Sequence, residues 1–322
     1  MDDYAEFRHL KYLLAIIEHK GVRAAAEALH ITQPSLSRQA KEFQQHYKLN
    51  FYRKSKSGRI EITKTGQALP IIFRDLLEAR DEAIAALKAI ELGEAEVLRI
   101  GCSPFIDKEV CKKASQLQKA LVPTSRIQFA NDNTAPLLDE LLHDRLDAAI
   151  VSLPITDERL RVEVIKRERL VVCLPSDHPL AKKAALSASD LSQNLTVFHR
   201  AAQHPEAHVR LLELLAELGV LFEEHSHTSH PQEMQEVVKN GEGFALIREG
   251  TQLIEGIITR PIIGVNWTVN TAVVFKRNPK SRLVPVLAKH LKREFLHSTV
   301  IQNYEPGSVK NAEPPSRIKK LG

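Results

Sequence analysis

The sequence predicts an α+β protein with several domains: a helix-turn-helix unit with a β-hairpin wing, a long helix, and an α/β domain. Three observations predict this class. A short alanine-rich helix and a second helix occupy residues 23–43, a stretch with few helix breakers runs from Thr65 to Leu92, and strand-like and helical segments alternate from Val97 onward. The 322 residues suffice for more than one core, and a hydrophobic content of 43% is typical of globular proteins.

The helix-turn-helix is predicted from local patterns. The chain breaks at His30–Ile31, Thr32 is a suitable N-cap, and Pro34 falls in the first turn of the second helix, where its missing N–H costs little. Apolar residues recur at helical spacing in a supporting helix (Phe7, Leu10, Leu13, Leu14, Ile17), in the first helix (Ala24, Ala25, Ala28, Leu29) and in the second (Leu36, Ala40, Phe43).

The opposite face of the second helix is polar, with Gln33, Ser35, Arg38 and Lys41. Such side chains hydrogen-bond base edges and phosphates, and arginine suits the O6 and N7 atoms of guanine. The pattern predicts a helix that enters the major groove of DNA. The alternative is an ordinary alanine-rich helical hairpin of an enzyme, but the cap, turn, proline and polar face together favour the DNA-binding unit.

A β-hairpin wing is expected after this helix, because two β-prone runs flank a basic turn at residues 54–59. Basic residues outnumber acidic ones from Arg38 to Lys64, with only Glu42 and Glu61 opposing Arg38, Lys41, Lys48, Arg53, Lys54, Lys56, Arg59 and Lys64. The net charge of the whole chain is only +5, so this local excess is the informative one. It predicts salt-dependent binding to a polyphosphate, although a solvated basic loop is the alternative.

The long helix carries a heptad-like seam. Its apolar residues alternate in steps of three and four: Leu69, Ile72, Leu76, Ala79, Ala83, Ala86 and Ile90. This pattern favours pairing with the same helix of a second copy, and a dimer is also needed to read two half-sites. The alternative is a monomeric linker helix packed on its own domain.

The remainder predicts an α/β domain and a tail. Strands are expected at 97–101, 126–130, 147–152, 170–174, 195–199, 221–225, 244–247 and 270–275, and helices at 108–121, 135–142, 206–218, 231–239 and 282–296. This alternation is typical of a parallel sheet. Residues 303–322 are rich in Pro, Lys and Ser without an apolar period, which predicts a disordered tail.

Together these segments resemble the LysR-type transcriptional regulators. The matching elements are 10–13 (LKYL), 23–29 (RAAAEAL), 32–38 (TQPSLSR), 62–63 with Gly66, 98–101 (LRIG), 146–150 (LDAAI), 171–181 (VVCLPSDHPLA) and 241–245 (GEGFA). The wing departs from the pattern, because it is longer and richer in lysine. The resemblance implies a winged helix-turn-helix (1–65), a linker and dimerisation helix (66–92), and a two-lobed effector domain like a periplasmic binding protein (93–302).

The resemblance also implies details within these domains. Lobe I would comprise 93–167 and 269–302, and lobe II 168–268, with crossings near Glu168 and Val269. The resemblance further implies assembly into a homotetramer, binding to promoter DNA and contact with RNA polymerase. The expected DNA-binding residues, from the helix pattern and the resemblance together, are Arg23, Thr32, Gln33, Pro34, Ser35, Ser37, Arg38, Lys41, Arg53 and Arg59.

An effector site is expected where the strands of the α/β domain end, because ligands of such sheets bind beyond the carboxyl ends of strands. The matching loops of LysR-type proteins line the effector cavity, so both arguments select the same residues: Cys102, Ser103, Pro104, Asn133, Ser152, Phe198, His199, Arg200 and Thr228. Ser103 would donate to a ligand oxygen, Phe198 would form a wall, and Arg200 would pair with a carboxylate. These residues predict a small anionic effector, but each also has a structural interpretation as a cap, turn former or surface cation.

Other classes of site receive little support. Some LysR-type proteins sense peroxide through cysteines, so a redox-sensing pair is the alternative that the resemblance offers for Cys102, Cys111 and Cys173. Neither their spacing nor their neighbours mark a sensor or a disulfide framework, so inert thiols are expected. The histidines at 225–230 lack accompanying zinc ligands, and His178 is interpreted as part of a turn. We therefore expect no metal, no cofactor besides the effector, and no enzyme activity.

The cellular location is also an expectation. The sequence has no apolar run long enough to span a bilayer and no N-terminal signal pattern, so a cytoplasmic protein without membrane contact is expected. The alternative function is a small-molecule-binding protein of the periplasmic type without a regulatory role on DNA, which the N-terminal helix-turn-helix disfavours.

Overall fold

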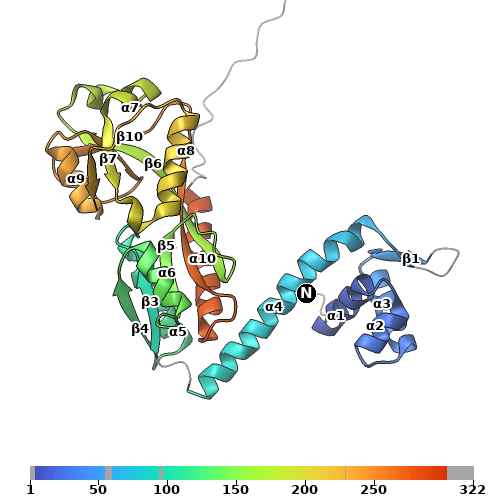
Figure 1. The fold of residues 1–322 in the computed structure, drawn as a ribbon. Helices are drawn as coiled ribbons and strands as arrows, with labels where there is room; N and C mark the ends of the chain where they lie inside the picture. The colour runs from blue at the N-terminus through green and yellow to red at the C-terminus, as the bar shows by residue number, and fades with distance from the viewer. Residues whose placement is uncertain (1–3, 55–59, 94–96, 229, 303–322) are drawn as a thin grey trace, which may run out of the picture. The chain divides into compact units, whose positions relative to one another are not determined.

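A computed structural model describes residues 4–54, 60–93, 97–228 and 230–302, and the expected tail at 303–322 and Arg59 lie outside these residues. The chain divides into two compact units, residues 1–88 and 89–322. Figure 1 shows the helices and strands of both units, coloured along the chain. None of the described helices is long and apolar enough to cross a membrane.

The N-terminal unit contains the expected helix-turn-helix. Its elements are the helices α1 (Phe7–Glu18), α2 (Val22–Ala28) and α3 (Gln33–His46), the strands β1 (Tyr52–Lys54) and β2 (Ile60–Ile62), and most of α4 (Lys64–Glu91). The turn between α2 and α3 places His30 in the left-handed region, at φ 53°. The core combines residues of all three short helices with Phe51 and Leu69.

One local expectation for this unit was wrong, and a second was confirmed only in its position. Ala24 and Ala28 are exposed, and the buried side of α2 is formed by Val22, Ala25 and Ala26. Alanine carries little apolar surface, so its spacing alone did not define the buried face. Thr32 occupies the N-cap position of α3, but its side chain makes no capping hydrogen bond. The predicted stripe of Leu36, Ala40 and Phe43 is buried as expected.

The wing is a two-stranded antiparallel hairpin in which Tyr52 pairs with Ile62. A buried glycine, Gly66, follows it near the start of α4. A Cβ at this position would lie 2.0 Å from the carbonyl oxygen of Phe51, so only glycine permits this close approach. The contact joins the strand region before the wing to α4.

Helix α4 exposes much of its apolar surface. Ile72 and Leu76 of the predicted seam are 56% and 49% exposed, and Leu87 is 66% exposed. Two residues of the predicted seam are not exposed. Leu69, at its start, is buried in the core of the N-terminal unit, and Ala86, towards its end, is also buried.

The C-terminal unit is built on a long mixed sheet. Its strands are β3 (Val97–Cys102), β4 (Arg126–Asn131), β5 (Ala148–Ser152), β6 (Leu160–Pro175), β7 (Leu195–His199), β8 (Ser226–Thr228), β9 (Phe244–Arg248), β10 (Ile257–Arg260) and β11 (Thr268–Lys276). The helices are α5 (Lys108–Leu121), α6 (Thr134–Leu142), α7 (Ala188–Asn194), α8 (Pro205–Glu217), α9 (Pro231–Lys239) and α10 (Leu283–Gln302), with 3-10 turns at Pro179–Lys182 and Ala201–Gln203.

One long strand, β6, runs through both halves of this unit. The strand order is β4-β3-β5-β11-β6-β9-β7-β8, and β10 also pairs with β6. One end of β6 pairs with β11, whereas residues 170–175 pair with β9 and β10. In the first lobe, α5 packs on β4, α6 packs on β5, and α10 packs on β6, β11 and α5 (Figure 1). In the second lobe, α9 packs on β7 to β9.

The structure differs from the expected elements at four places. The strand expected at 221–225 is wrong, since the strand of this region is β8 at Ser226–Thr228. The sequence analysis missed residues 160–169 of β6, whose many charged residues conceal a strand that is only half-buried at most of its positions. It also missed α7 and β10, which are short and carry weak periodicity.

Candidate DNA-binding surface and effector cavity

The predicted DNA-binding residues of α3 form an accessible face. Gln33, Pro34, Arg38 and Lys41 are exposed, as is Thr32 at the N-cap, whereas Ser35 and Ser37 are half-buried. Ser35 accepts a hydrogen bond from the Nε2 atom of Gln39 at 3.4 Å. The N-terminal end of α3 therefore presents donors and acceptors in a position where a groove of DNA could receive them.

Two further predicted contacts lie around this face. Arg23 on α2 is exposed and its Nε atom lies 3.1 Å from Oε1 of Glu27, which is an exposed pair of little energetic weight. Arg53 on β1 is exposed, and Arg59 lies outside the described residues.

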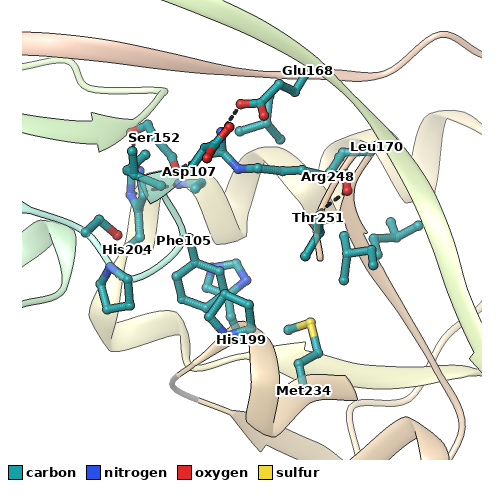
Figure 2. Close-up of a pocket in the computed structure, with 18 of the residues that line it drawn as sticks. Phe105, Asp107, Ser152, Glu168, Leu170, His199, His204, Met234, Arg248 and Thr251 are labelled. Carbon is teal, nitrogen blue, oxygen red and sulfur yellow. Dashed lines mark hydrogen bonds and ion pairs between the residues drawn. The ribbon is translucent and has the colours of Figure 1, made fainter. Parts of the chain in front are cut away.

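The C-terminal unit contains a cavity of about 450 Å³ between its two lobes (Figure 2). Several predicted effector-site residues line it: Ser103, Pro104, Asn133, Ser152 and His199. Phe105 from the loop after β3 and His199 from the end of β7 face each other with ring centroids 6.2 Å apart. Apolar side chains such as Leu170 and Met234 contribute much of the remaining wall.

The other predicted effector residues do not line this cavity. Cys102 is buried beside Cys111, and Arg200 is exposed at the start of a 3-10 turn. Phe198 is buried in the core of the second lobe and borders only a neighbouring void of about 20 Å³. Thr228 is 1% exposed, and its hydroxyl donates to the carbonyl oxygen of Phe198 at 3.5 Å.

Sequence reasoning missed several residues of the cavity. The additional polar residues include Asp107, Thr134, Glu168, Gln203, His204, Arg248 and Thr251. Arg248 is the last residue of β9. The strand expected from the sequence ended one residue earlier, at Ile247, so the search for polar residues at strand ends passed over Arg248. Glu168 had no such signal, because it lies inside β6.

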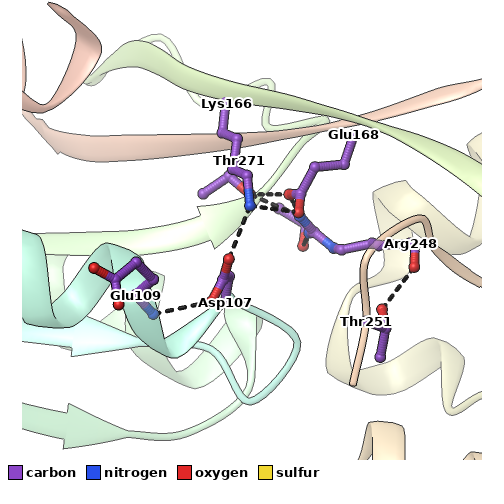
Figure 3. A network of polar contacts seen from close by, with 8 residues as sticks. Asp107, Glu109, Lys166, Glu168, Arg248, Thr251 and Thr271 are labelled. Carbon is purple, nitrogen blue, oxygen red and sulfur yellow. Dashed lines mark hydrogen bonds and ion pairs between the residues drawn. The ribbon is translucent and has the colours of Figure 1, made fainter. Parts of the chain in front are cut away.

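A charge network that is buried at Arg248 and Glu168 and exposed at Asp107 forms one side of the cavity (Figure 3). The Nη1 atom of Arg248 donates to Oε2 of Glu168 at 2.6 Å and to Oγ1 of Thr271 at 2.6 Å, and Nη2 bonds to Oγ of Ser152. The Nζ atom of Lys166 lies 2.9 Å from Oε1 of Glu168 and 2.9 Å from Oδ2 of Asp107. These contacts connect β9 of the second lobe with β5 and the start of α5 in the first.

The ionisation of this network follows from burial and pairing. Burial lowers the pKa of Arg248, and the neighbouring carboxylate of Glu168 opposes that effect. Burial also acts to lower the pKa of Lys166, but hydrogen bonds with Asp107 and Glu168 outweigh it and raise the pKa. The two cations and two carboxylates therefore balance, and Arg248 is not a free cation awaiting an anion.

Two histidines at the cavity are held in the neutral form. Burial and the neighbouring His208 and His204 lower the pKa of His199 to about 4. Burial likewise lowers the pKa of His204, whose Nε2 atom lies 2.8 Å from the carbonyl oxygen of Ser152. His204 therefore links the second lobe to the end of β5.

The chain matches two protein-family models that together span both units. Residues 7–67 match the bacterial regulatory helix-turn-helix protein of the lysR family, and residues 92–296 match the LysR substrate binding domain. The chain belongs to the LysR-type transcriptional regulator family. The second match contains all of the cavity residues named above, and the first contains α3 and its polar face.

Curated relatives of this LysR-type regulator agree with the assignment. The regulator BudR of Raoultella terrigena is 25% identical over 284 residues, which cover 87% of this chain and 97% of BudR. The regulator BenM of Acinetobacter baylyi is 25% identical over 252 residues, which cover 78% of this chain and 82% of BenM. These relatives are transcriptional regulators and not enzymes.

Solved structures show the same fold. Full-length BenM has a TM-score of 0.56 at 20% identity, with coverage of 94% of this chain and 100% of BenM. Full-length CbnR in complex with its target DNA has a TM-score of 0.54 at 17% identity, with coverage of 90% and 99%. The LysR-type regulator is thus a DNA-binding transcriptional regulator with an effector-binding domain, and a solute-binding protein without a role on DNA is not favoured.

Proposed function

We propose that this regulator binds promoter DNA as a homodimer or a homotetramer and has no catalytic activity. We further propose that a small organic acid in the cavity switches the geometry of DNA binding. Contact with RNA polymerase belongs to the same proposal. The observation that carries it is the combination, in one chain, of an exposed polar face on α3 and a cavity of about 450 Å³ between two lobes.

The assignment of individual DNA contacts rests on exposure and chemistry. We assign base reading to Gln33, Pro34, Ser35 and Arg38 at the start of α3, because their side chains occupy its outer face. Thr32, Ser37 and Lys41 would position the helix on phosphates, and Arg23, Arg53 and Arg59 would add phosphate contacts around it.

The assignment of a dimer rests on the apolar surface of α4. Ile72, Leu76 and Leu87 would stay exposed to water in a single copy, and a partner helix that covers them removes this cost. At a rise of about 1.5 Å per residue, the helix is about 40 Å long, which suffices to hold two DNA-binding units apart.

The chemical class of the effector follows from the cavity wall. At the start of α6, the side chain of Asn133 makes no capping hydrogen bond to the first backbone N–H groups of the helix, and Asn133 and Thr134 line the cavity together with Ser103. Helix N-termini favour anions. Apolar neighbours such as Phe105 and Met234 suit a hydrophobic body. A small organic acid with its carboxylate near Asn133 matches both features, and Arg200 has no part in this site.

Binding would act by shifting populations of assembled states. An effector that contacts Ser103 in one lobe and His199 in the other favours the lobe arrangement in which both contacts form. The lobes belong to subunits of one assembly, so their rearrangement changes the spacing of the DNA-binding units and the bend of the DNA.

A titration with organic acids tests this proposal. Aromatic and aliphatic monoacids, matched to their neutral amides, are added to the purified protein while its melting temperature and its DNase footprint are recorded. We expect acids, but not their amides, to raise the melting temperature and change the footprint, with Ser103→Ala weakening both responses. A rise produced only by neutral or cationic compounds would overturn the anionic assignment.

A further inference from the structure

The two cysteines near the start of the effector domain lie in direct contact. The Sγ atoms of Cys102, at the end of β3, and Cys111, in α5, are 2.7 Å apart. The spacing of these cysteines does not predict the contact, because the loop at 103–107 has to reverse the chain before α5 can bring Cys111 back to β3. Both thiols are reduced in the structure.

The surroundings of the pair disfavour a metal site. Across the residues that the structure describes, no group of three or more His, Cys, Asp or Glu side chains is arranged to hold a metal ion. A tetrahedral zinc site needs more protein ligands than two thiolates. Contact between two thiols without further ligands is instead the arrangement from which a disulfide forms.

The two thiols differ in accessibility and in acidity. Cys102 is 5% exposed, whereas Cys111 is half-buried and lies near the N-terminal end of α5. The hydrogen bond with Cys102 lowers the pKa of Cys111, and the same contact together with burial raises the pKa of Cys102. Cys111 is therefore the more readily ionised thiol, and the thiolate is the form that attacks an oxidant.

We propose that Cys102 and Cys111 form a dithiol site that hydroperoxides oxidise to a disulfide. The Cys111 thiolate attacks the O–O bond of a hydroperoxide, becomes a sulfenic acid and releases the alcohol or water of the cleaved peroxide once it takes up a proton. The Cys102 thiol then attacks the sulfenic sulfur, the S–S bond forms and water leaves. In sum, two thiols lose two electrons and two protons, and one hydroperoxide is reduced.

This site adjoins the effector cavity without being part of it. The disulfide would tie together the two ends of the loop at 103–107, in which Ser103, Phe105 and Asp107 line the cavity. Asp107 also pairs with Lys166 in the charge network. Oxidation would thus restrain the segment that an effector contacts. The chemistry itself requires neither an effector nor DNA, so its test is independent of the proposed function.

Peptide mapping of the full-length protein tests the proposal. The reduced protein is treated with a small excess of hydrogen peroxide, alkylated to block exchange, and digested with trypsin, which cleaves after Lys108 between the two cysteines. We expect two peptides joined through Cys102 and Cys111 that separate on addition of dithiothreitol. The pair should oxidise about tenfold or more faster than Cys173, because burial raises the pKa of that thiol to about 12.

Three variants resolve the roles. Cys173→Ser should still form the joined peptides at the wild-type rate, which makes it the matched control. Cys102→Ser should stop at a sulfenic acid on Cys111 that dimedone traps, and Cys111→Ser should leave Cys102 reduced. The proposal is overturned if wild type and Cys173→Ser, whose folding is checked by melting temperature, yield no joined peptides, or if all three cysteines oxidise at the same rate.

Discussion

Arg248 and Glu168 form an ion pair in the interior of the effector domain, with Nη1 and Oε2 2.6 Å apart and side chains only 11% and 9% exposed. Arg248 ends β9 of the second lobe, and Glu168 lies on β6, which runs through both lobes. A bond from Arg248 to Ser152 of β5 extends the contact into the first lobe. The pair therefore couples the lobe arrangement to the electrostatics of the cavity wall.

Removing the two partners of this pair should have unequal effects on stability. Glu168→Gln leaves the buried Arg248 guanidinium without its carboxylate and should lower the free energy of unfolding by about 3–5 kcal/mol. Arg248→Met should cost less, because Glu168 keeps its contact with Lys166. Urea unfolding followed through the single tryptophan, Trp267, measures both values.

The exposed end of the network supplies the control for that comparison. Asp107→Asn removes a carboxylate that is 42% exposed, and we expect a loss of no more than about 1 kcal/mol. Equal losses for Asp107→Asn and Glu168→Gln would contradict the view that burial sets the energetics of this network.

The neutral histidine at the cavity predicts acid sensitivity. The pKa of His199 is about 4 in the folded protein and near 6.5 when unfolded, so the unfolded chain takes up this proton first as the pH falls. Its contribution is intact above pH 6.5 and is lost as the pH falls towards 4, by up to about 3 kcal/mol at about 1.36 kcal/mol per pKa unit.

Replacing His199 isolates this effect. Urea unfolding over the same pH window should show a flatter pH dependence for His199→Phe than for wild type. His225→Asn alters a histidine that is 57% exposed and should leave the dependence unchanged. If the two variants follow the wild-type curve alike, burial of His199 is not the source of the acid sensitivity.

The apolar stripe of α4 predicts a specific oligomerisation defect. Leu76→Lys places a charge in the proposed helix-helix contact and should shift the protein towards monomers in sedimentation velocity, because an unpaired ammonium would be buried there. Ile71→Lys is the matched control, since Ile71 is 73% exposed on a different face of the same helix. A wild-type sedimentation profile for Leu76→Lys would exclude this stripe as the contact.

How much of the structure the sequence predicts depends on the range of the interactions involved. The helix-turn-helix follows from short-range signals, namely the break at His30–Ile31, Pro34 in the first turn, and the spacing of Leu36, Ala40 and Phe43. The face of α2 was harder to predict, because four nearby alanines give similar weak signals and packing against α1 and α3 decides between them.

The cavity shows the same limit. Strand ends correctly brought Ser103, Ser152 and His199 together, but Phe198 and His199 are neighbours on one strand and point to opposite faces of the sheet. The pairing of Glu168 with Arg248 joins positions 80 residues apart, and the contact of Cys102 with Cys111 depends on the path of one loop. No local pattern encodes these contacts.

The reading of DNA by α3 is tested most directly by a quantitative gel shift with the promoter region beside this protein's own gene. We propose that Arg38 contacts a base edge, and we therefore predict that Arg38→Ala weakens binding by about 1–3 kcal/mol and relaxes selectivity at one base position. Lys41→Ala should weaken binding about equally on all sequences and reduce the salt dependence, as expected for a phosphate contact. Unchanged affinity and selectivity in Arg38→Ala would contradict the proposal that the N-terminal residues of α3 enter the major groove.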